Sequence, residues 1–307
     1  MTGTRRYPAR ALALIGALML IVGLWAGCTP ATPSGLSFTF DVAADMRDLT
    51  GPNEFRGVAQ AVARAGAGAF MISPGDIDPP AAVFDVIRSE LGVGYPWYPV
   101  VGNHEAETVE DMAWLRGFNP GGNLLPGIVN PGPSGSLETC YSFDYENAHF
   151  VVINEYFDGS VDNDPIGDVS AALYLWLSDD LANHSLPVTF VIGHEPAFPQ
   201  PDMAPPHRLR HEGDSLDANT TTRNDFWALL SAEGVRAYIC GHTHNYSAIK
   251  IDGVWQVDTG HARGTGDTGA PSTFIKITVW EDNSVTYETW RQNARSTRYE
   301  VSDSGAW

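Results

Sequence analysis

The sequence predicts an α/β fold built on a parallel or mixed sheet. In the first half of the chain, short apolar runs typical of buried strands alternate with segments whose apolar residues recur at helical spacing. Four polar motifs also occur along the chain, and each directly follows an apolar run. Ligands of open α/β sheets bind at the carboxyl ends of the strands, so the motifs predict one shared site.

The alternation of strands and helices is clearest before residue 120. Strands are expected at 37–44, 69–72 and 97–101. Helices are expected over 54–65, from Pro79 and Pro80 onward, and over 108–115. Asn53 is a suitable cap for the first of these helices, and proline is favoured in the first turn of the second. Such a β-α-β-α-β-α order predicts a sheet with helices on its faces.

The second half of the chain is predicted to contain two long loops, two helices and several hairpins. The loops cover 121–136 and 196–222, and loops of that length in a compact domain are usually functional. Asp168 is expected to cap a helix ending at Leu181, and a further helix covers 224–232. Strands are expected at 140–145, 148–155, 188–192, 235–240, 247–251, 254–258, 273–279 and 285–290. The Asp252-Gly253 pair predicts a type I′ hairpin turn.

The N-terminal segment is predicted to be a targeting signal and not part of the fold. Three arginines precede an apolar run over 11–26, which is shorter than a full membrane span. The run ends at Gly27-Cys28, which resembles a bacterial lipoprotein signal whose cysteine is acylated. We therefore expect a signal peptide at 1–27, a tether at 28–36, one domain at 37–295 and a C-terminal tail at 296–307. The protein is expected to be exported to the cell envelope.

Charge and cysteine content narrow the classes of partner. Loss of Arg5, Arg6 and Arg10 with the signal leaves 15 of the 18 basic residues against 37 acidic ones, so the net charge changes from −19 to −22. This charge argues against nucleic acid or an anionic lipid surface as a partner. Besides Cys28, the chain contains Cys140 and Cys240, and we favour two free, packed thiols over a disulfide.

The four polar motifs carry the candidate chemistry. They are Pro-Gly-Asp at 74–76, Gly-Asn-His-Glu at 102–105, Gly-His-Glu-Pro at 193–196 and Gly-His-Thr-His at 241–244. Each motif alone is weak evidence, because Gly-Asp and Asn are common in ordinary turns. Gly-His-Thr-His is the most specific of the four motifs, since two histidines after a buried strand are rarely needed for the structure alone. Imidazole, amide and carboxylate groups together suit transition metals such as Fe, Zn, Mn, Co or Ni.

In their order, these motifs resemble those of the calcineurin-like metallophosphoesterases, with features of the purple acid phosphatase side of that superfamily. The resemblance covers about 37–279. It implies a four-layer α-β-β-α fold in which two mixed sheets pack face to face between helices. It also implies that Asp76, Asn103, His194 and His242 hold one metal, and that Asp45, Asp76 and His244 hold another.

The implied activity is hydrolysis of phosphate esters, with phosphomonoesters favoured. Two metals form a clamp for in-line displacement at phosphorus, and a metal-bound hydroxide is the nucleophile. By resemblance, His104 protonates the leaving oxygen or binds the phosphoryl group. The expected partner is a small phosphorylated substrate, with contact to a membrane only through the N-terminal lipid anchor.

The first motif departs from the family pattern Asp-x-His. Asp41 and Asp45 are both candidates for its aspartate, and we prefer Asp45 because it lies at the end of the strand, where a ligand belongs. Arg47 then occupies the place of the histidine ligand, and arginine cannot bind a cation. Arg47 could instead pair with a phosphate oxygen. The metal at this half is therefore expected to be weakly held, or to be replaced by the charge of Arg47.

Other basic residues are candidates for binding the substrate. His207, Arg208, Arg210 and His211 lie close together in the loop after His194, where they would attract a phosphate or simply form a solvated loop. His261 and Arg263 are further candidates, in a Gly-rich stretch. Two alternatives to a phosphomonoesterase remain: a phosphodiesterase of the same fold, and an envelope-anchored binding protein with a degenerate metal site.

Overall fold

The computed structural model describes residues 1, 3, 35–46, 53–263, 269–293, 295–296 and 298–307. The chain divides into two units, Met1–Thr32 and Pro33–Trp307, and the second contains the folded domain. Nearly all of the expected signal peptide and most of the expected tether lie outside the described residues, as does Arg47. Among the residues that are described, no helix combines the length and the apolar character needed to cross a membrane.

The first sheet contains six strands from both ends of the domain. They are β1 (Leu36–Val42), β2 (Met71–Ser73), β3 (Trp97–Pro99), β11 (Thr273–Trp280), β12 (Val285–Gln292) and β13 (Tyr299–Ala306). Their order is β13-β12-β11-β1-β2-β3. The strands β1, β2 and β3 are parallel, and β11 pairs with β1 in antiparallel fashion. This sheet is therefore mixed, and the carboxyl ends of its three parallel strands share one edge.

The second sheet contains seven strands and is also mixed. They are β4 (Ile128–Pro131), β5 (Tyr141–Tyr145), β6 (Ala148–Val152), β7 (Val188–Ile192), β8 (Ala237–Cys240), β9 (Tyr246–Ile251) and β10 (Val254–Thr259). Their order is β4-β5-β6-β7-β8-β10-β9. The four strands β6, β7, β8 and β10 are parallel. At the predicted hairpin between β9 and β10, Asp252 and Gly253 both have positive φ, as a type I′ turn requires.

The two sheets pack against each other through an aromatic core. Alternate residues of β1 enter this core, as the period-two geometry of strands requires: they are Phe38, Phe40 and Val42. Tyr98 of the first sheet stacks on Phe143 of the second, with ring centroids 3.8 Å apart. Burying one such aromatic side chain contributes about 1.5–3 kcal/mol. This core fixes the two sheets relative to each other.

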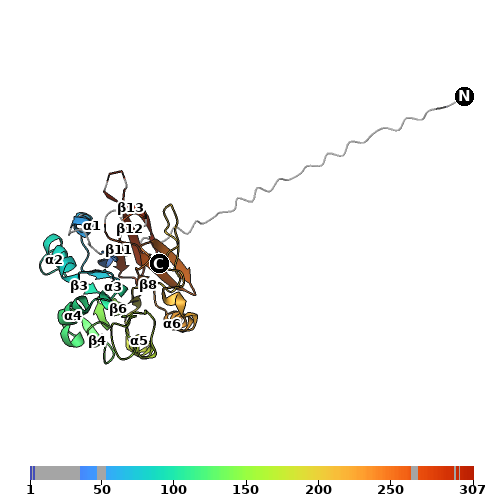
Figure 1. Ribbon diagram of the computed structural model, residues 1–307. Coiled ribbons are helices and arrows are strands. Elements are labelled where there is room, and N and C mark those ends of the chain that lie inside the picture. The colour runs from blue at the N-terminus through green and yellow to red at the C-terminus, as the bar shows by residue number, and fades with distance from the viewer. Residues whose placement is uncertain (2, 4–34, 47–52, 264–268, 294, 297) are drawn as a thin grey trace. The chain divides into compact units, whose positions relative to one another are not determined.

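The helices form the two outer layers. The helices α1 (Asn53–Arg64), α2 (Pro80–Glu90) and α4 (Val109–Phe118) pack on the first sheet, and α5 (Ala171–Asn183) and α6 (Thr220–Ala232) pack on the second. Figure 1 shows α1 and α2 on the side of β3, and α6 on the side of β8. The short helix α3 (Asn103–Ala106) follows β3 directly. The predicted four-layer fold of two mixed sheets between helices is confirmed.

Two segments predicted to be irregular contain strands. Within the expected loop 121–136, β4 pairs with β5, and Asn130 also donates to the carboxylate of Asp180 on α5. Within the expected C-terminal tail 296–307, β13 pairs with β12 along the edge of the first sheet. The expectation of a tail was wrong there because β13 is rich in polar and small residues and has no regular apolar alternation that would indicate a strand.

The two helices on the second sheet begin at different residues from those predicted. Ser170 caps α5, because its hydroxyl accepts from the backbone of Leu173. Asp168 instead accepts hydrogen bonds from Asn219 and Thr222 at the start of α6. Asn219 caps α6, which therefore begins at Thr220 and not at Asn224. Cys140 and Cys240 are both free and buried, as expected.

Candidate metal centre

The predicted ligands follow the carboxyl ends of parallel strands in both sheets. Asp45, Asp76 and Asn103 come after β1, β2 and β3 of the first sheet. His194 comes after β7 of the second sheet, and His242 and His244 come after β8. The packing of the two sheets therefore brings together side chains that are up to 199 positions apart in the sequence. This arrangement agrees with the expectation of one shared site at the strand ends.

Four of these residues have a left-handed backbone conformation. The φ angles are 52° at Asp45, 52° at Asp76, 72° at His242 and 61° at His244. Positive φ is uncommon for residues other than glycine and costs free energy, so such residues cluster where function requires a special direction of the side chain. Here the left-handed turn ends each strand and directs the side chain into the site.

The glycines of the motifs are required because the ligands approach the backbone closely. A Cβ atom at Gly75 would lie 2.3 Å from Nδ1 of His194. A Cβ atom at Gly102 would lie 2.3 Å from the backbone nitrogen of Asp76. Neither approach is possible for a residue with a side chain, so these glycines are part of the site's construction.

His194 is held in one tautomer by the backbone. Its Nδ1 lies 2.8 Å from the carbonyl oxygen of Pro74 and donates a hydrogen bond to it. The side chain is fully buried, and burial lowers its pKa to about 4. The ring is therefore neutral at pH 7, and its Nε2 carries a lone pair and no proton. A histidine that binds a metal typically has its other ring nitrogen hydrogen-bonded in this way.

The Nε2 atom of His194 faces a set of atoms that a cation would satisfy. Oδ1 of Asn103 lies 3.2 Å away, Oδ1 of Asp76 lies 3.4 Å away, and Nδ1 of His242 lies 3.2 Å away. A proton on Nδ1 of His242 would satisfy this lone pair alone, whereas a cation would satisfy it together with the oxygens of Asn103 and Asp76. Two imidazoles, an amide oxygen and a carboxylate form a donor set suited to a transition metal. The residues present therefore fit the metal that the resemblance implies.

Glu105 organises the backbone around Asp76. This buried carboxylate accepts hydrogen bonds from the backbone nitrogens of Asp76, Ile77 and Gly102, at 3.0, 2.8 and 2.7 Å. Burial and the charges of Asp76 and Asp78 raise its pKa well above the usual range. The last residue of Gly-Asn-His-Glu thus joins the Asp76 turn to the Asn103 turn.

Glu155 organises the backbone around His194 in the same way. Its carboxylate accepts from the backbone nitrogens of His194 and Glu195, at 2.9 and 2.7 Å, and from the hydroxyl of Tyr238. Burial raises its pKa to about 7. A second buried carboxylate, Glu195, accepts from the hydroxyl of Tyr156 at 2.8 Å. The backbone that carries His194 is therefore supported by buried acids on the second sheet.

A second group of candidate ligands lies next to the first. Ligand atoms of Asp45, Asp76 and His244 all lie within 4.8 Å of one another, and all three residues are buried. Burial and the charges of Asp76 and Asp258 raise the pKa of Asp45 well above its usual range, although Arg263 acts in the opposite direction. Carboxylates collected in this way repel one another, so positive charge is needed among them.

The structure distinguishes Asp41 from Asp45. Asp41 lies within β1 and faces away from the site, where it pairs with Nζ of Lys276 at 3.0 Å. It also accepts from the backbone of Gly68 and the hydroxyl of Tyr95. Asp45 lies beside His244, with Oδ1 3.4 Å from its Nε2, and accepts from the backbone nitrogen of His242. The geometry therefore supports the preference for Asp45.

The predicted substrate-binding residues lie at different distances from the ligand set. His104 is adjacent to it, with Nε2 3.6 Å from Oδ2 of Asp76. Arg210 contacts His244 directly, whereas Arg208 is exposed and accepts from Asn245 through its backbone carbonyl. His261 is buried beside the site, with its ring centroid 6.1 Å from that of His244 and its Nε2 directed to the carbonyl of Ala270.

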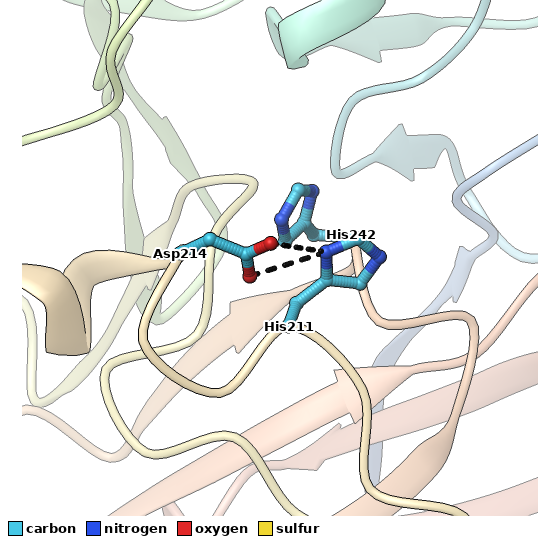
Figure 2. Close-up of side chains that lie close together, drawn as sticks. All are labelled: His211, Asp214 and His242. Carbon is cyan, nitrogen blue, oxygen red and sulfur yellow. Dashed lines mark hydrogen bonds and ion pairs between the residues drawn. The ribbon is translucent and has the colours of Figure 1, made fainter.

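His211 of the long loop lies over His242. Their ring centroids are 4.2 Å apart. Figure 2 shows the Nδ1 edge of His211 turned toward the two carboxylate oxygens of Asp214, at 3.3 and 3.4 Å. Ligand atoms of His211, Asp214 and His242 also lie within 4.8 Å of one another. His211 and Asp214 of the loop 196–219 therefore lie at the edge of the site.

Some site residues have roles that the sequence patterns did not predict. Glu105 lies inside a recognised motif, and its place three residues after a helix-initiating Gly102 is a capping signal that could have indicated its backbone contacts. Asp258 lies within β10, one residue before its end, where it accepts from Thr243 and Gly260, and burial raises its pKa to about 8. Asp214 has no comparable signal, because it lies in a loop without a strand before it.

The fold thus places a set of candidate metal ligands at the strand ends of two mixed sheets. The family model for calcineurin-like phosphoesterases matches residues 40–246. The match spans more than half of the chain, so the protein belongs to the calcineurin-like phosphoesterase family. No curated protein matches the sequence.

Solved structures with the same architecture include two with TM-scores above 0.5. One is GAP50, the anchor in the inner membrane complex of Plasmodium, with a TM-score of 0.55 and 13% identity over 88% of this chain and 88% of that chain. The other is PhoD, with a TM-score of 0.57 and 12% identity over 91% of this chain and 69% of that chain. At these identities the similarity supports the fold alone.

Proposed function

We propose that this protein hydrolyses phosphate esters at a metal centre held by Asp76, Asn103, His194 and His242. The observation that carries the proposal is the surroundings of His194 Nε2. Its lone pair faces the oxygens of Asn103 and Asp76 at 3.2 and 3.4 Å, and a cation satisfies all three atoms at once. Membership of the calcineurin-like phosphoesterases supports hydrolysis as the reaction.

The bound ion would supply Lewis acidity, which activates water and neutralises phosphoryl charge. The chain's own residues prepare this chemistry. The carbonyl of Pro74 keeps the proton of His194 on Nδ1, and Glu105 fixes the backbone that presents Asp76. Buried carboxylates and neutral imidazoles are therefore positioned before any ligand arrives, so little reorganisation is needed.

His104 is the proposed proton donor to the leaving oxygen. It is partly exposed, and its ring lies between the carboxylates of Asp76 and Glu107, with nitrogen-oxygen distances of 3.6 and 3.8 Å. This position at the edge of the ligand set is where a group that protonates a leaving oxygen would be needed. Small phosphomonoesters are the proposed substrates, on the basis of the Gly-Asn-His-Glu and His-Glu-Pro motifs and the strongly acidic composition.

The proposal is tested with aryl phosphates and metal analysis. Wild-type protein loaded with Mn²⁺ or Zn²⁺ should hydrolyse a mono-aryl phosphate faster than a bis-aryl phosphate. Asp76→Asn and His242→Ala should each abolish both bound metal and turnover. Asp225→Asn, which changes an exposed carboxylate on α6, is the matched control and should retain both.

Three results would each require a different conclusion. Full activity in either Asp76→Asn or His242→Ala would refute the metal centre. Faster turnover of the bis-aryl substrate would identify a phosphodiesterase instead. A wild-type protein that binds no transition metal and turns over neither substrate would favour the binding-protein alternative.

We propose separately that the protein is exported and anchored through acylated Cys28. The support is the sequence of the N-terminal segment: three arginines, an apolar run and a cysteine after Gly27. Cells fed labelled fatty acid should incorporate label into the wild-type protein and not into Cys28→Ser, while Cys140→Ser serves as the control. Labelling of Cys28→Ser at the wild-type level would rule out this attachment site.

A further inference from the structure

Two arginine side chains contact the second group of candidate ligands. Nη1 of Arg210 lies 2.7 Å from Nδ1 of His244, and Nη2 of Arg263 lies 3.1 Å from the same atom. Arg210 comes from the loop after β7, and Arg263 follows β10. Arg263 is 8% exposed, so its charge is almost entirely removed from water. Two guanidinium groups therefore converge on one histidine.

These contacts determine the tautomer of His244. Arginine has five donors and no acceptor, so Nδ1 of His244 accepts in both contacts and carries no proton. The proton of the neutral ring is then on Nε2, which faces Oδ1 of Asp45 at 3.4 Å. A ring nitrogen that carries a proton has no lone pair for a metal. His244 in this state donates toward Asp45 and does not act as a ligand.

The contrast with His194 is direct. The ring of His194 donates through Nδ1 to a carbonyl and leaves Nε2 available, which is the arrangement of a metal ligand. Nδ1 of His244 contacts two guanidinium groups, whereas Nδ1 of His194 contacts a carbonyl oxygen. The first group of ligands thus fits a transition metal, whereas the second group contains positive charge supplied by the chain itself.

We propose that Arg210 and Arg263 take the place of the second metal ion, so that this protein binds a single ion, at Asp76, Asn103, His194 and His242. The proposal rests on the metal centre of the proposed function and deepens it. The two guanidinium groups balance the buried carboxylates of Asp45 and Asp76. They also present fixed donors to a phosphoryl group, since guanidinium binds phosphate oxygens through paired hydrogen bonds.

The first test is the stoichiometry of bound metal. Wild-type protein, Arg210→Met/Arg263→Met and Arg88→Met are equilibrated with excess Mn²⁺, desalted and analysed for metal per chain. Arg88 is an exposed arginine on α2 and serves as the matched control. The wild type and the control should retain a single ion, and the double variant should retain a second. Arg263→Gln provides a milder variant if the double variant does not fold.

The outcomes separate this proposal from the proposed function. Two ions per wild-type chain would overturn the replacement by arginine and leave the phosphoesterase intact. No ion in the wild type would overturn the metal centre itself. A single ion in the wild type, in Arg210→Met/Arg263→Met and in Arg263→Gln would also overturn the proposal. The guanidinium groups would then not be what excludes the second ion.

The second test reads the tautomers directly. Long-range ¹H–¹⁵N spectra of histidine-labelled, Zn²⁺-loaded protein should show His244 with its proton on Nε2 and His194 with its proton on Nδ1. A proton on Nδ1 of His244 would contradict the contacts on which the proposal rests. This measurement does not depend on activity, and assignment uses the His244→Gln and His194→Gln spectra.

Discussion

Replacing Asp41 and Asp45 separately by asparagine should have very different effects on stability. Asp41 is fully buried and pairs with the nearly buried ammonium of Lys276 at 3.0 Å. Within the described part of the chain, Asp41 is the only acidic residue that contacts this ammonium, so Asp41→Asn removes its compensating charge. Breaking a buried pair by removing one partner costs about 3–5 kcal/mol. For a domain of this size that corresponds to a melting temperature lower by roughly 10 °C.

Asp45→Asn removes a charge that its surroundings disfavour. Asp45 and Asp76 have ligand atoms within 4.8 Å, and two like charges at that distance repel by roughly 3 kcal/mol at an effective dielectric constant of about 20. Burial and this repulsion raise the pKa of Asp45. The attraction between Arg263 and Asp45 opposes this repulsion, so the metal-free Asp45→Asn protein should lose much less stability than the Asp41→Asn protein does.

The assay is urea and thermal unfolding of both variants in the presence of a chelator. The pair is well matched, because each variant changes one buried carboxylate near β1 to its amide. A large loss of stability in Asp45→Asn, or none in Asp41→Asn, would refute the assignment of Asp41 to the structural pair and of Asp45 to the site.

Three further predictions concern the backbone of the site and a distant charge cluster. Gly102→Ala should lower metal affinity at least tenfold in a Mn²⁺ titration, because its Cβ atom would lie 2.3 Å from the nitrogen of Asp76. Glu105→Gln places an amide donor against backbone donors and should cost about 1–3 kcal/mol in urea unfolding. His149 is buried, which lowers its pKa, but hydrogen bonds to Asp180 and Asp144 raise the pKa overall. The stability that this proton provides is fully present below pH 6.5 and is lost as pH rises through the folded-state pKa. The difference in melting temperature between wild type and His149→Gln should therefore shrink from pH 6 to pH 9; a constant difference would contradict the raised pKa.

The strand-end rule explains which parts of the site could be predicted from the sequence. Asp76, Asn103, His194 and His242 each follow a short apolar run. Any one of them alone fits an ordinary turn, so the prediction depended on the four motifs occurring together. The same rule favoured Asp45 over Asp41, because a carboxylate within a strand needs a buried partner. That partner, Lys276, is 235 positions away, so only the structure could identify it.

The strand-end rule could not predict the contacts of residues that lie in loops. Arg210 and His211 were singled out by composition, but their contacts with His244 and His242 depend on the path of a long loop. Likewise, β13 was missed because its mostly polar and small residues show no apolar alternation that would indicate a buried face. The misplaced start of α5 had a different cause: Asp168 and Ser170 are both good caps, and Asp168 is engaged by Thr222 of the next helix.

The most direct test of the metal centre is anomalous diffraction from a crystal of Mn²⁺-loaded protein. We predict a peak bounded by Asp76, Asn103, His194 and His242. Absence of a peak there at full Mn²⁺ loading would contradict the central claim that these four residues form the metal centre.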